Sequence, residues 1–172
     1  TLMRFYEFQK GSIEIDDHNI REYRQQELRK KIGLVLQEPY LFYGDIASNI
    51  RMFDQKMTDL QIKQAAEFVQ ADKFIADLPE TYHQPVSERG MTYSAGQRQL
   101  LAFARTIVRD PKILILDEAT ANLDTQTEKL IQKSLAKMRK NRTTLIVAHR
   151  LSTIEDADLI LVLDHGQIVE RG

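Results

Sequence analysis

The chain has 172 residues, of which 42% are hydrophobic and 28% charged, with a formal net charge of −1 and no cysteine. This length and composition are typical of one globular domain with a real core, and the near-neutral charge argues against a general nucleic-acid binder. The lack of cysteine excludes disulfides and thiolate metal sites. The longest apolar runs have five residues, whereas a membrane-spanning helix needs roughly 20, so we expect no membrane span in these residues.

The N-terminal part of the chain predicts short strands followed by a helical region. The segment Leu2–Tyr6 reads as the end of an apolar helix that belongs to a longer chain. The helical region runs from about Asp45 to Arg109. In chain order, the pattern predicts a short strand at Gly11–Asp16, a buried strand at Ile32–Leu36, amphipathic helices at Gln61–Gln70 and Asp72–Leu78, and a longer helix at Ser94–Arg109.

After Asp110-Pro111 the pattern changes to strands that alternate with a helix. Continuous apolar strands separated by helices indicate an α/β fold whose parallel sheet is covered on both faces. The final apolar runs flank a tight turn and predict a hairpin. In chain order, we expect a buried strand at Ile113–Leu116, a helix at Thr125–Lys140, a buried strand at Thr144–Ala148, and hairpin strands at Leu159–Leu163 and Gln167–Glu170 around Asp164-His165-Gly166.

Two adjacent carboxylates, Asp117 and Glu118, follow the strand Ile113–Leu116. Ligands of a parallel sheet bind at the carboxyl ends of its strands, so we expect both side chains to face a crevice. One carboxylate can hold Mg²⁺, directly or through water, while the other polarises an attacking water. An Asp-Glu pair alone more often marks a solvated turn, but its position after this strand and helix favours a functional site.

The helix at Ser94–Arg109 begins with Ser94-Ala95-Gly96-Gln97, which predicts a capping box between Ser94 and Gln97. The same geometry presents free backbone N–H groups and the positive end of the helix dipole, which suit an anion. Gly96 costs the helix roughly 1 kcal/mol relative to alanine, and a close approach of phosphate to the backbone would explain its presence. The cap alone does not decide between a well-started helix and an anion site.

Together these segments resemble the ATPases of ATP-binding-cassette (ABC) transporters. Tyr93–Gln97 is similar to the family's signature Leu-Ser-Gly-Gly-Gln, and Ile113–Asp117, followed by Glu118, resembles the Walker B strand and the catalytic glutamate. The motifs stand in the family's order and span essentially the whole chain. Three further positions resemble the Q-loop glutamine, the D-loop and the switch histidine, namely Gln37, Ala121–Asp124 and His149.

The resemblance implies a P-loop NTPase (RecA-like) fold with ATP and Mg²⁺ as cofactors. In such a fold, residues 1–44 and 110–172 form the parallel sheet core, residues 45–109 form an inserted helical subdomain, and a short antiparallel β element is added. The residues implied to act in hydrolysis are Glu118, His149 and Gln37. Those implied to hold the metal are Asp117 and Gln37, and those implied to contact ATP are Tyr93, Ser94, Ala95, Gly96, Gln97 and Asp124.

The resemblance also implies partners. Two cassettes would sandwich two ATP molecules, each against the signature helix of the other, so one partner is a second ABC nucleotide-binding domain. The loop Val86–Gly90 is similar to that of exporters, which implies transmembrane domains, in the same polypeptide, and a location at the cytoplasmic face of the cell membrane. The aromatic segment Pro39–Tyr43 reads either as subdomain core or as a groove for a helix of the membrane domain. No nucleic-acid partner is expected.

Two departures from the family's pattern matter. The 172 residues contain no Gly-x-x-x-x-Gly-Lys-[Ser/Thr] loop, which supplies backbone N–H groups and a lysine to the phosphates. We therefore expect the chain to begin after that loop, and ATP hydrolysis to belong to a parent protein. Tyr93 and Ala95 depart from the usual signature, which fits a heterodimer whose partner supplies the normal signature, or a harmless variant of a homodimer.

Two other functions fit parts of the sequence. A soluble ABC ATPase of DNA repair or chromosome structure carries a long coiled-coil insertion, and the spacing from Gln37 to Ser94 leaves no room for one. A non-catalytic or degenerate ABC module fits the missing phosphate loop, but Glu118 and His149 count against it. The ATPase of an exporter is therefore the function that the sequence favours.

Overall fold

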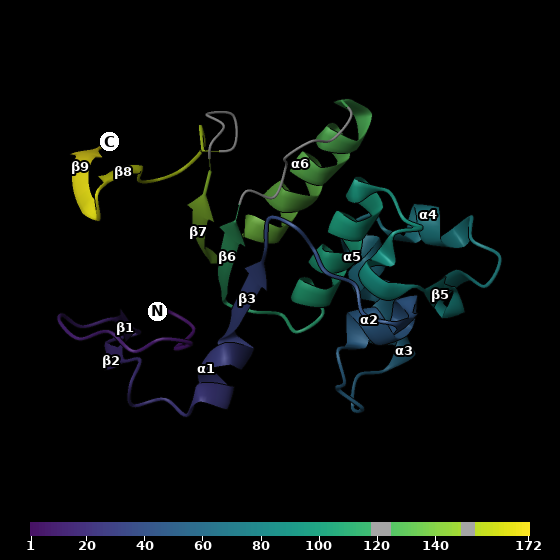
Figure 1. Ribbon diagram of the computed structural model, residues 1–172, viewed down its shortest axis with the longest axis horizontal. Helices are drawn as coiled ribbons and strands as arrows, with labels where there is room; N and C mark the ends of the chain where they lie inside the picture. The colour runs from purple at the N-terminus through teal and green to yellow at the C-terminus, as the bar shows by residue number, and fades with distance from the viewer. Residues whose placement is uncertain (118–124, 149–153) are drawn as a thin grey trace.

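The computed structural model describes residues 1–117, 125–148 and 154–172 (Figure 1). Its centre is a parallel three-stranded sheet in which the strand order is β3-β6-β7. These strands are Ile32–Val35, Ile113–Asp117 and Thr143–Val147. The chain thus has the α/β architecture with a parallel core that the alternation of apolar runs and helices predicts.

The register of the sheet brings the carboxyl ends of all three strands to one edge. Val35, the last residue of β3, lies beside Leu116 of β6. Asp117, the last residue of β6, lies beside Val147 of β7. Chain segments that follow these strands therefore leave the sheet from neighbouring positions, where ligands of parallel sheets bind.

Two helices, α5 (Ala95–Ile107) and α6 (Thr125–Arg139), cover one face of this sheet (Figure 1). Leu114 and Leu116 of β6 are almost fully buried in the same cluster as Ile131 and Leu135 of α6. Burying one such side chain contributes roughly 1.5–3 kcal/mol.

Strand β3 also packs tightly onto α5. A Cβ added at Gly33 would lie 2.6 Å from Thr106 Cγ2 of that helix. Only glycine therefore allows this close approach, and it fixes where α5 lies over the sheet.

Three short helices lie on the far side of α5 from the sheet (Figure 1). Two of them begin with complete capping boxes, formed by Asp45 with Ser48 at α2 and by Thr58 with Gln61 at α3. Their buried residues join the cluster that covers the sheet, so α5 has apolar neighbours on both sides. The three helices are α2 (Ile46–Arg51), α3 (Asp59–Phe68) and α4 (Asp72–Ala76).

The opposite face of the sheet is only partly covered. Ile20 and Leu28, from the N-terminal segment, form a second apolar cluster against Ile113 and Ile115 of β6. This segment contains the paired strands β1 and β2 and the helix α1. Their bounds are Glu14–Ile15, His18–Asn19 and Gln25–Lys31.

Two further antiparallel pairs complete the described structure. The strands β4 and β5 join the helical region, and β8 and β9 form the C-terminal hairpin. The hairpin turns at His165 and Gly166, with φ of 47° and 78°, as a tight turn between twisted strands requires. The bounds are Gly44–Asp45, Pro85–Val86, Leu161–Asp164 and Gln167–Arg171, and short 3₁₀ turns stand at Thr81–His83 and Glu88–Gly90.

Some sequence-based expectations differ from the structure. Strand β7 is not buried, because Leu145 and Val147 point to the open face and are 49% and 53% exposed. The sheet is therefore not fully covered on both faces by the described residues. Residues 1–6 form turns rather than a helix, and six residues are too few for helix nucleation to be favourable. The strand expected at Gly11–Asp16 is confined to Glu14–Ile15, where its partner is available.

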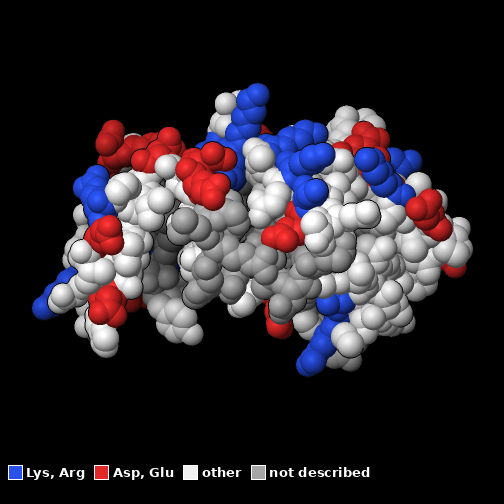
Figure 2. Space-filling view, turned by 90° about the horizontal axis from the view of Figure 1, so that it is seen from above, with Lys and Arg blue, Asp and Glu red and all other residues white. Residues whose placement is uncertain are grey.

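Acidic and basic side chains are interspersed on the face of the molecule seen in Figure 2. This distribution agrees with the net charge of −1. Among the residues that the structure describes, none belongs to a helix that combines the length and the apolar character needed to cross a membrane.

Candidate functional site

Gln37 and Asp117 lie at the same edge of the sheet. Asp117 ends β6, and Gln37 follows shortly after the last residue of β3, the strand beside it. Asp117 is half-buried and Gln37 is exposed. A carboxylate and an amide oxygen at neighbouring strand ends are oxygen ligands of the kind that Mg²⁺ prefers.

The other predicted residues of this edge lie outside the described residues. They are Glu118, Asp124 and His149. In the sequence, Glu118 directly follows β6 and His149 comes shortly after the end of β7. Within residues 1–117, 125–148 and 154–172, no three His, Cys, Asp or Glu side chains are grouped so that they could hold a metal ion.

The capping box predicted at the start of α5 is confirmed. Ser94 Oγ accepts a hydrogen bond from the backbone N–H of Gln97 at 3.2 Å, and Gln97 Oε1 accepts one from the N–H of Ser94 at 2.9 Å. Ser94 and Ala95 are exposed, whereas Gly96 is buried. The first N–H groups of a helix have no intrahelical acceptor, so this N-terminus offers donors to an anion.

The structure gives a packing reason for glycine at position 96 that cannot be read from the sequence. A Cβ at this position would lie 2.0 Å from Thr127 Cγ2 of α6. Glycine is therefore required by the packing of α5 against α6, independently of any phosphate. The same contact fixes the signature segment relative to the helix that follows β6.

Tyr93 anchors the signature from the other side. The residue is 5% exposed, and its hydroxyl donates a hydrogen bond to the carbonyl of Pro85 in β5 at 3.2 Å. Its edge meets the ring of Phe74 in α4 with 6.5 Å between centroids. Burial raises the pKa of the Tyr93 hydroxyl, which therefore stays protonated and can donate. The side chain holds Ser94 in place and does not reach the surface beside it.

A buried amide connects α5 to the segment that follows Gln37. Asn49 of α2 donates to the carbonyls of Phe42 and Asp45 at 2.8 and 3.0 Å, and its Oδ1 accepts from the N–H of Phe42 at 2.8 Å. Arg105 of α5 donates to the same Oδ1 at 2.8 Å, to the Asn49 carbonyl at 2.9 Å and to the Tyr40 carbonyl at 2.8 Å. These bonds satisfy both ends of the amide at once.

Arg105 is charged although it is largely surrounded by protein. Burial lowers its pKa to about 10, which leaves the guanidinium protonated at neutral pH. Its carbon Cζ lies 5.4 Å from the centre of the Phe42 ring, a cation–π contact. The loop from Tyr40 to Asp45 is thus held against the helix whose N-terminus carries the signature. We refer to Asn49 and Arg105 together as the amide hub.

The amide hub is not among the features predicted from the sequence. A signal was available, because Asn49 stands between Ile46 and Ile50 on the apolar face of α2. A polar residue at an apolar-face position is buried only when its hydrogen bonds are satisfied. The identity of the partner, 56 residues away in Arg105, could not be read from local spacing.

An aromatic groove opens beside this loop. It has a volume of about 190 Å³, and Phe42, Tyr43, Arg51, Met52 and Phe53 are among its lining residues. Tyr43 and Phe53 are 88% and 82% exposed. Exposed aromatic side chains that gather around a hollow are typical of protein–protein contact sites.

The backbone of the groove is strained. Met52 and Phe53 both have positive φ, at 48° and 65°, which bulky residues rarely adopt. Such conformations gather at functional positions, where the surrounding structure enforces them. Met52 ends α2 in this way, with its N–H bonded to the Ser48 carbonyl, and the turn projects Phe53 into solvent.

Residues 1–121 match the sequence profile of a family described as ABC transporter. The chain belongs to the ABC transporter family. The capped start of α5 and the sheet edge at Asp117 both lie within the matched residues. ATP-binding domains of this family are in general ATPases, and membership implies ATP binding.

Individual relatives support this family. The chain is 63% identical over its full length to exp8 of Streptococcus pneumoniae, which is named as an ABC transporter ATP-binding protein. It is 53% identical, over 99% of its length, to YheH of Bacillus subtilis, which is named as a multidrug resistance ABC transporter ATP-binding/permease protein. The chain spans 29% and 25% of the lengths of these relatives.

A solved structure has the same fold. A bacterial Atm1-family ABC exporter with ATP bound superposes with a TM-score of 0.90 over 99% of this chain and 30% of its own, at 43% identity. The expected P-loop NTPase fold, with its parallel core, helical part and short antiparallel strands, is thereby confirmed.

Proposed function

We propose that this chain is part of the ATP-hydrolysing cassette of an ABC exporter, which powers transport through ATP-driven dimerisation. The observation that carries the proposal is the exposed capping box at Ser94 on a helix held rigidly against the sheet. The sheet edge at Gln37 and Asp117 supplies the complementary part of such a site. The names of the relatives, which include ATP-binding and permease functions, agree with it.

In the proposed mechanism the chain's residues bind and orient the reactants. Asp117 and Gln37 are the ligands through which Mg²⁺ would be held, and the ion would neutralise charge on the phosphates of ATP. Glu118 accepts a hydrogen bond from the attacking water and polarises it. His149 and Gln37 align that water with the γ-phosphate, whose bond to the β-phosphate breaks to give ADP and phosphate.

The signature acts on a nucleotide held by a second ABC nucleotide-binding domain. Ser94, Ala95, Gly96 and Gln97 would present the N-terminus of α5 to the γ-phosphate of that ATP. Asp124 contacts the same interface, and Tyr93 takes part through its backbone, since its side chain is buried. Hydrolysis removes the bridging γ-phosphate contact, so the dimer reopens.

The dimer partner is either an identical cassette or a different one. Tyr93 and Ala95 depart from the usual signature, which favours a different cassette that supplies a normal signature to the productive site. Full-rate ATP hydrolysis and transport by a homodimer of the full-length protein would refute the heterodimer.

The aromatic groove is the surface proposed for the membrane domain. Its exposed Tyr43 and Phe53 offer apolar contacts to a helix, and Phe42 is tied through the amide hub to the helix that carries the signature. A displacement of the groove residues by the membrane domain would therefore also displace the N-terminus of α5, which carries the signature. The membrane domain would lie in the same polypeptide, which places the cassette at the cytoplasmic face of the cell membrane.

The same proposal divides the chain into two parts. Residues 1–44 and 110–172 belong to the RecA-like core, and residues 45–109 form the helical subdomain that carries the signature. The amide hub crosses this division at two residues, because Arg105 donates to the carbonyl of Tyr40 and Asn49 bonds to the backbone of Phe42.

The test uses Glu118→Gln in the purified full-length protein reconstituted in lipid. The substitution removes the polarising carboxylate while leaving ATP binding in place, so we expect ATP hydrolysis to fall at least about 100-fold and closed dimers to accumulate. Phosphate release and size-exclusion chromatography with ATP measure the two effects. Glu155→Gln, at an exposed position, is the matched control. Brisk turnover by the Glu118→Gln protein would refute the role of Glu118.

A further inference from the structure

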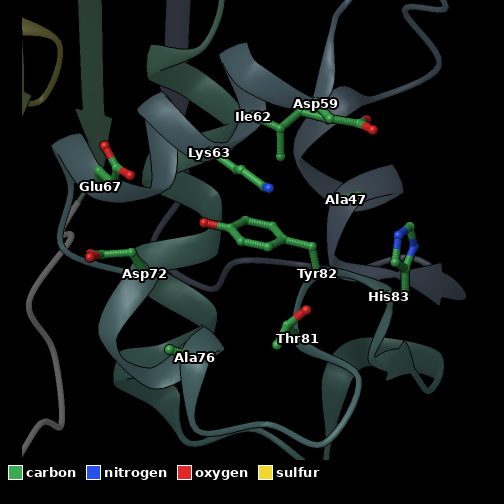
Figure 3. A pocket seen from close by; sticks show the side chains of 10 residues that line it. All are labelled: Ala47, Asp59, Ile62, Lys63, Glu67, Asp72, Ala76, Thr81, Tyr82 and His83. Atoms are coloured by element: carbon green, nitrogen blue, oxygen red, sulfur yellow. The ribbon is translucent and has the colours of Figure 1, made fainter.

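A second hollow lies within the helical part of the molecule, away from the sheet edge (Figure 3). Its volume is about 450 Å³, within the roughly 300–1,000 Å³ typical of small-ligand sites. Helices α2, α3 and α4 and the turn at Thr81–His83 all contribute to its walls. Four separate segments thus converge on one cavity, which none of the proposed ATPase steps uses.

One wall of the cavity is a single face of α3. Asp59, Ile62, Lys63 and Glu67 line it, and their spacing of three and four residues places them on the same side of the helix. Ile62 is buried, whereas Lys63 and Glu67 are exposed. The helix therefore gives the cavity an apolar floor and charged groups above it.

The cavity is lined by charged groups of both signs, and three of them form no ion pair among the described residues. Within the described part of the chain, Lys63 forms no ion pair, and neither do Glu67 of α3 and Asp72 of α4. Asp59 and His83 differ, because they are engaged by Arg51 at 2.5 Å and by Asp45 at 3.4 Å. One cation and two carboxylates are therefore available to a ligand.

The phenol of Tyr82 separates these two kinds of charge. In Figure 3 its hydroxyl points toward the end of the cavity where Glu67 and Asp72 lie, and the ammonium of Lys63 projects into the hollow above its ring. Burial, followed by the carboxylates of Asp72 and Glu67, raises the pKa of the Tyr82 hydroxyl. The phenol consequently stays neutral and protonated, and its oxygen can also accept a hydrogen bond.

We propose that this cavity binds a free α-amino acid with an aliphatic side chain. The ligand's ammonium would lie between Glu67 and Asp72, with the oxygen of Tyr82 as an acceptor. Its carboxylate would pair with Lys63, and its side chain would lie on Ile62 and the ring of Tyr82. A single lysine matches one carboxylate better than the double charge of a phosphate, which favours an amino acid over a phosphorylated amine.

The site would share a wall with the aromatic groove. Arg51 lines the groove, and its ion-pair partner Asp59 lines the cavity, while α2 contributes residues to both. A ligand in the cavity would therefore contact the structure that shapes the groove. The binding itself does not depend on the proposed ATPase, so the two can fail separately.

The first arm of the test compares three ligands. Isothermal titration of the full-length protein in lipid nanodiscs, without nucleotide, would use L-leucine, L-leucinamide and N-acetyl-L-leucine. Leucinamide lacks the carboxylate and N-acetyl-leucine lacks the ammonium, so we expect leucine to bind about ten-fold more tightly than either. Absence of saturable leucine binding, or equal binding of the three, would overturn the proposal.

The second arm uses variants that remove the proposed partner of either the ligand's carboxylate or its ammonium. Lys63→Met should abolish the preference for leucine over leucinamide, and the double variant Glu67→Gln with Asp72→Asn should abolish the preference over N-acetyl-leucine. Lys56→Met and Glu80→Gln change charges of the same kind outside the cavity and should leave both preferences intact. Unchanged binding in the cavity variants would locate the leucine elsewhere in the protein and refute the site.

Discussion

The two faces of the central sheet carry apolar side chains of the same kind but are covered very differently. On the helical face, Leu114 is fully buried beneath α5 and α6, whereas Leu145 on the opposite face of β7 is about half exposed. The hairpin β8–β9, drawn in yellow in Figure 1, likewise exposes Leu163 and Ile168. An apolar strand therefore identifies a position that requires a cover, while the covering segment depends on contacts far along the chain.

The helical face is also the one that positions the signature. The amide hub ties α5 to the loop after Gln37, and Gly96 and Tyr93 fix its N-terminus against α6 and β5. The N-terminal segment on the opposite face has arginine contacts of its own, from Arg4 to the carbonyl of Tyr23 and from Arg29 to that of Met3, but these bonds do not reach α5. Substitutions on the two faces should therefore have unequal effects on stability.

The largest expected effect is that of Leu114→Ala. The change removes buried methyl groups and leaves a cavity, so we expect the free energy of unfolding to fall by about 2–5 kcal/mol. Leu145→Ala, on the open face, should cost less than about 1 kcal/mol because its side chain is already in contact with water. Urea denaturation of the 172-residue chain, followed by circular dichroism, measures both.

The same two variants have a different expected outcome in the full-length protein. If a further segment covers the open face there, Leu145→Ala should become nearly as destabilising as Leu114→Ala. Equal losses already in the 172-residue chain would contradict the difference between the two faces.

Asn49→Ala tests the amide hub. It leaves the N–H of Phe42 and the guanidinium of Arg105 without their buried acceptor, so we expect a loss of about 2–4 kcal/mol in stability. In the full-length protein, stimulation of ATP hydrolysis by transported compounds should also fall. Gln64→Ala, on the exposed surface of α3, is the control. A cost no larger than that of the control would mean that the hub does not hold the loop.

Gly96→Ala tests whether the packing of α5 against Thr127 requires glycine at this position. The new Cβ meets Thr127 Cγ2, so the variant should be destabilised by about 1–3 kcal/mol. Thr127→Ser removes that methyl group, and in this background Gly96→Ala should be neutral or stabilising, because alanine favours helix by about 1 kcal/mol. Thermal denaturation measures the stability of Gly96→Ala with and without Thr127→Ser. Failure of the serine to rescue stability would show that another contact excludes the alanine.

The sequence predicted those features that local spacing determines. The capping box of Ser94 and Gln97, the turn at Asp164–Gly166 and the strand that ends at Asp117 all have signals within a few residues. The motif order also predicted the family. These elements needed no knowledge of distant partners.

Features that depend on distant partners were missed or misread. The sequence leaves Gly96 open between a well-started helix and a phosphate contact, and it does not predict that Thr127 of another helix packs against this position. Strand β7 was expected to be buried because its residues are apolar, although no described segment covers its outer side. The sequence also gave no indication that Asn49 and Arg105 would meet, nor that Lys63, Glu67 and Asp72 would surround one cavity.

Tyr93→Phe has the smallest expected effect and tests the anchor of the signature. It removes only the hydroxyl that donates to Pro85, so stability should fall by about 1 kcal/mol. Tyr6→Phe, at an exposed position, is the control. Because β5 pairs with β4 beside Asp45, the lost bond loosens the signature from the segment that borders the aromatic groove. The KM for ATP of the full-length protein should then rise with little change in kcat. An unchanged KM, together with the stability loss, would show that the Tyr93 hydroxyl contributes to stability but not to the interaction with ATP.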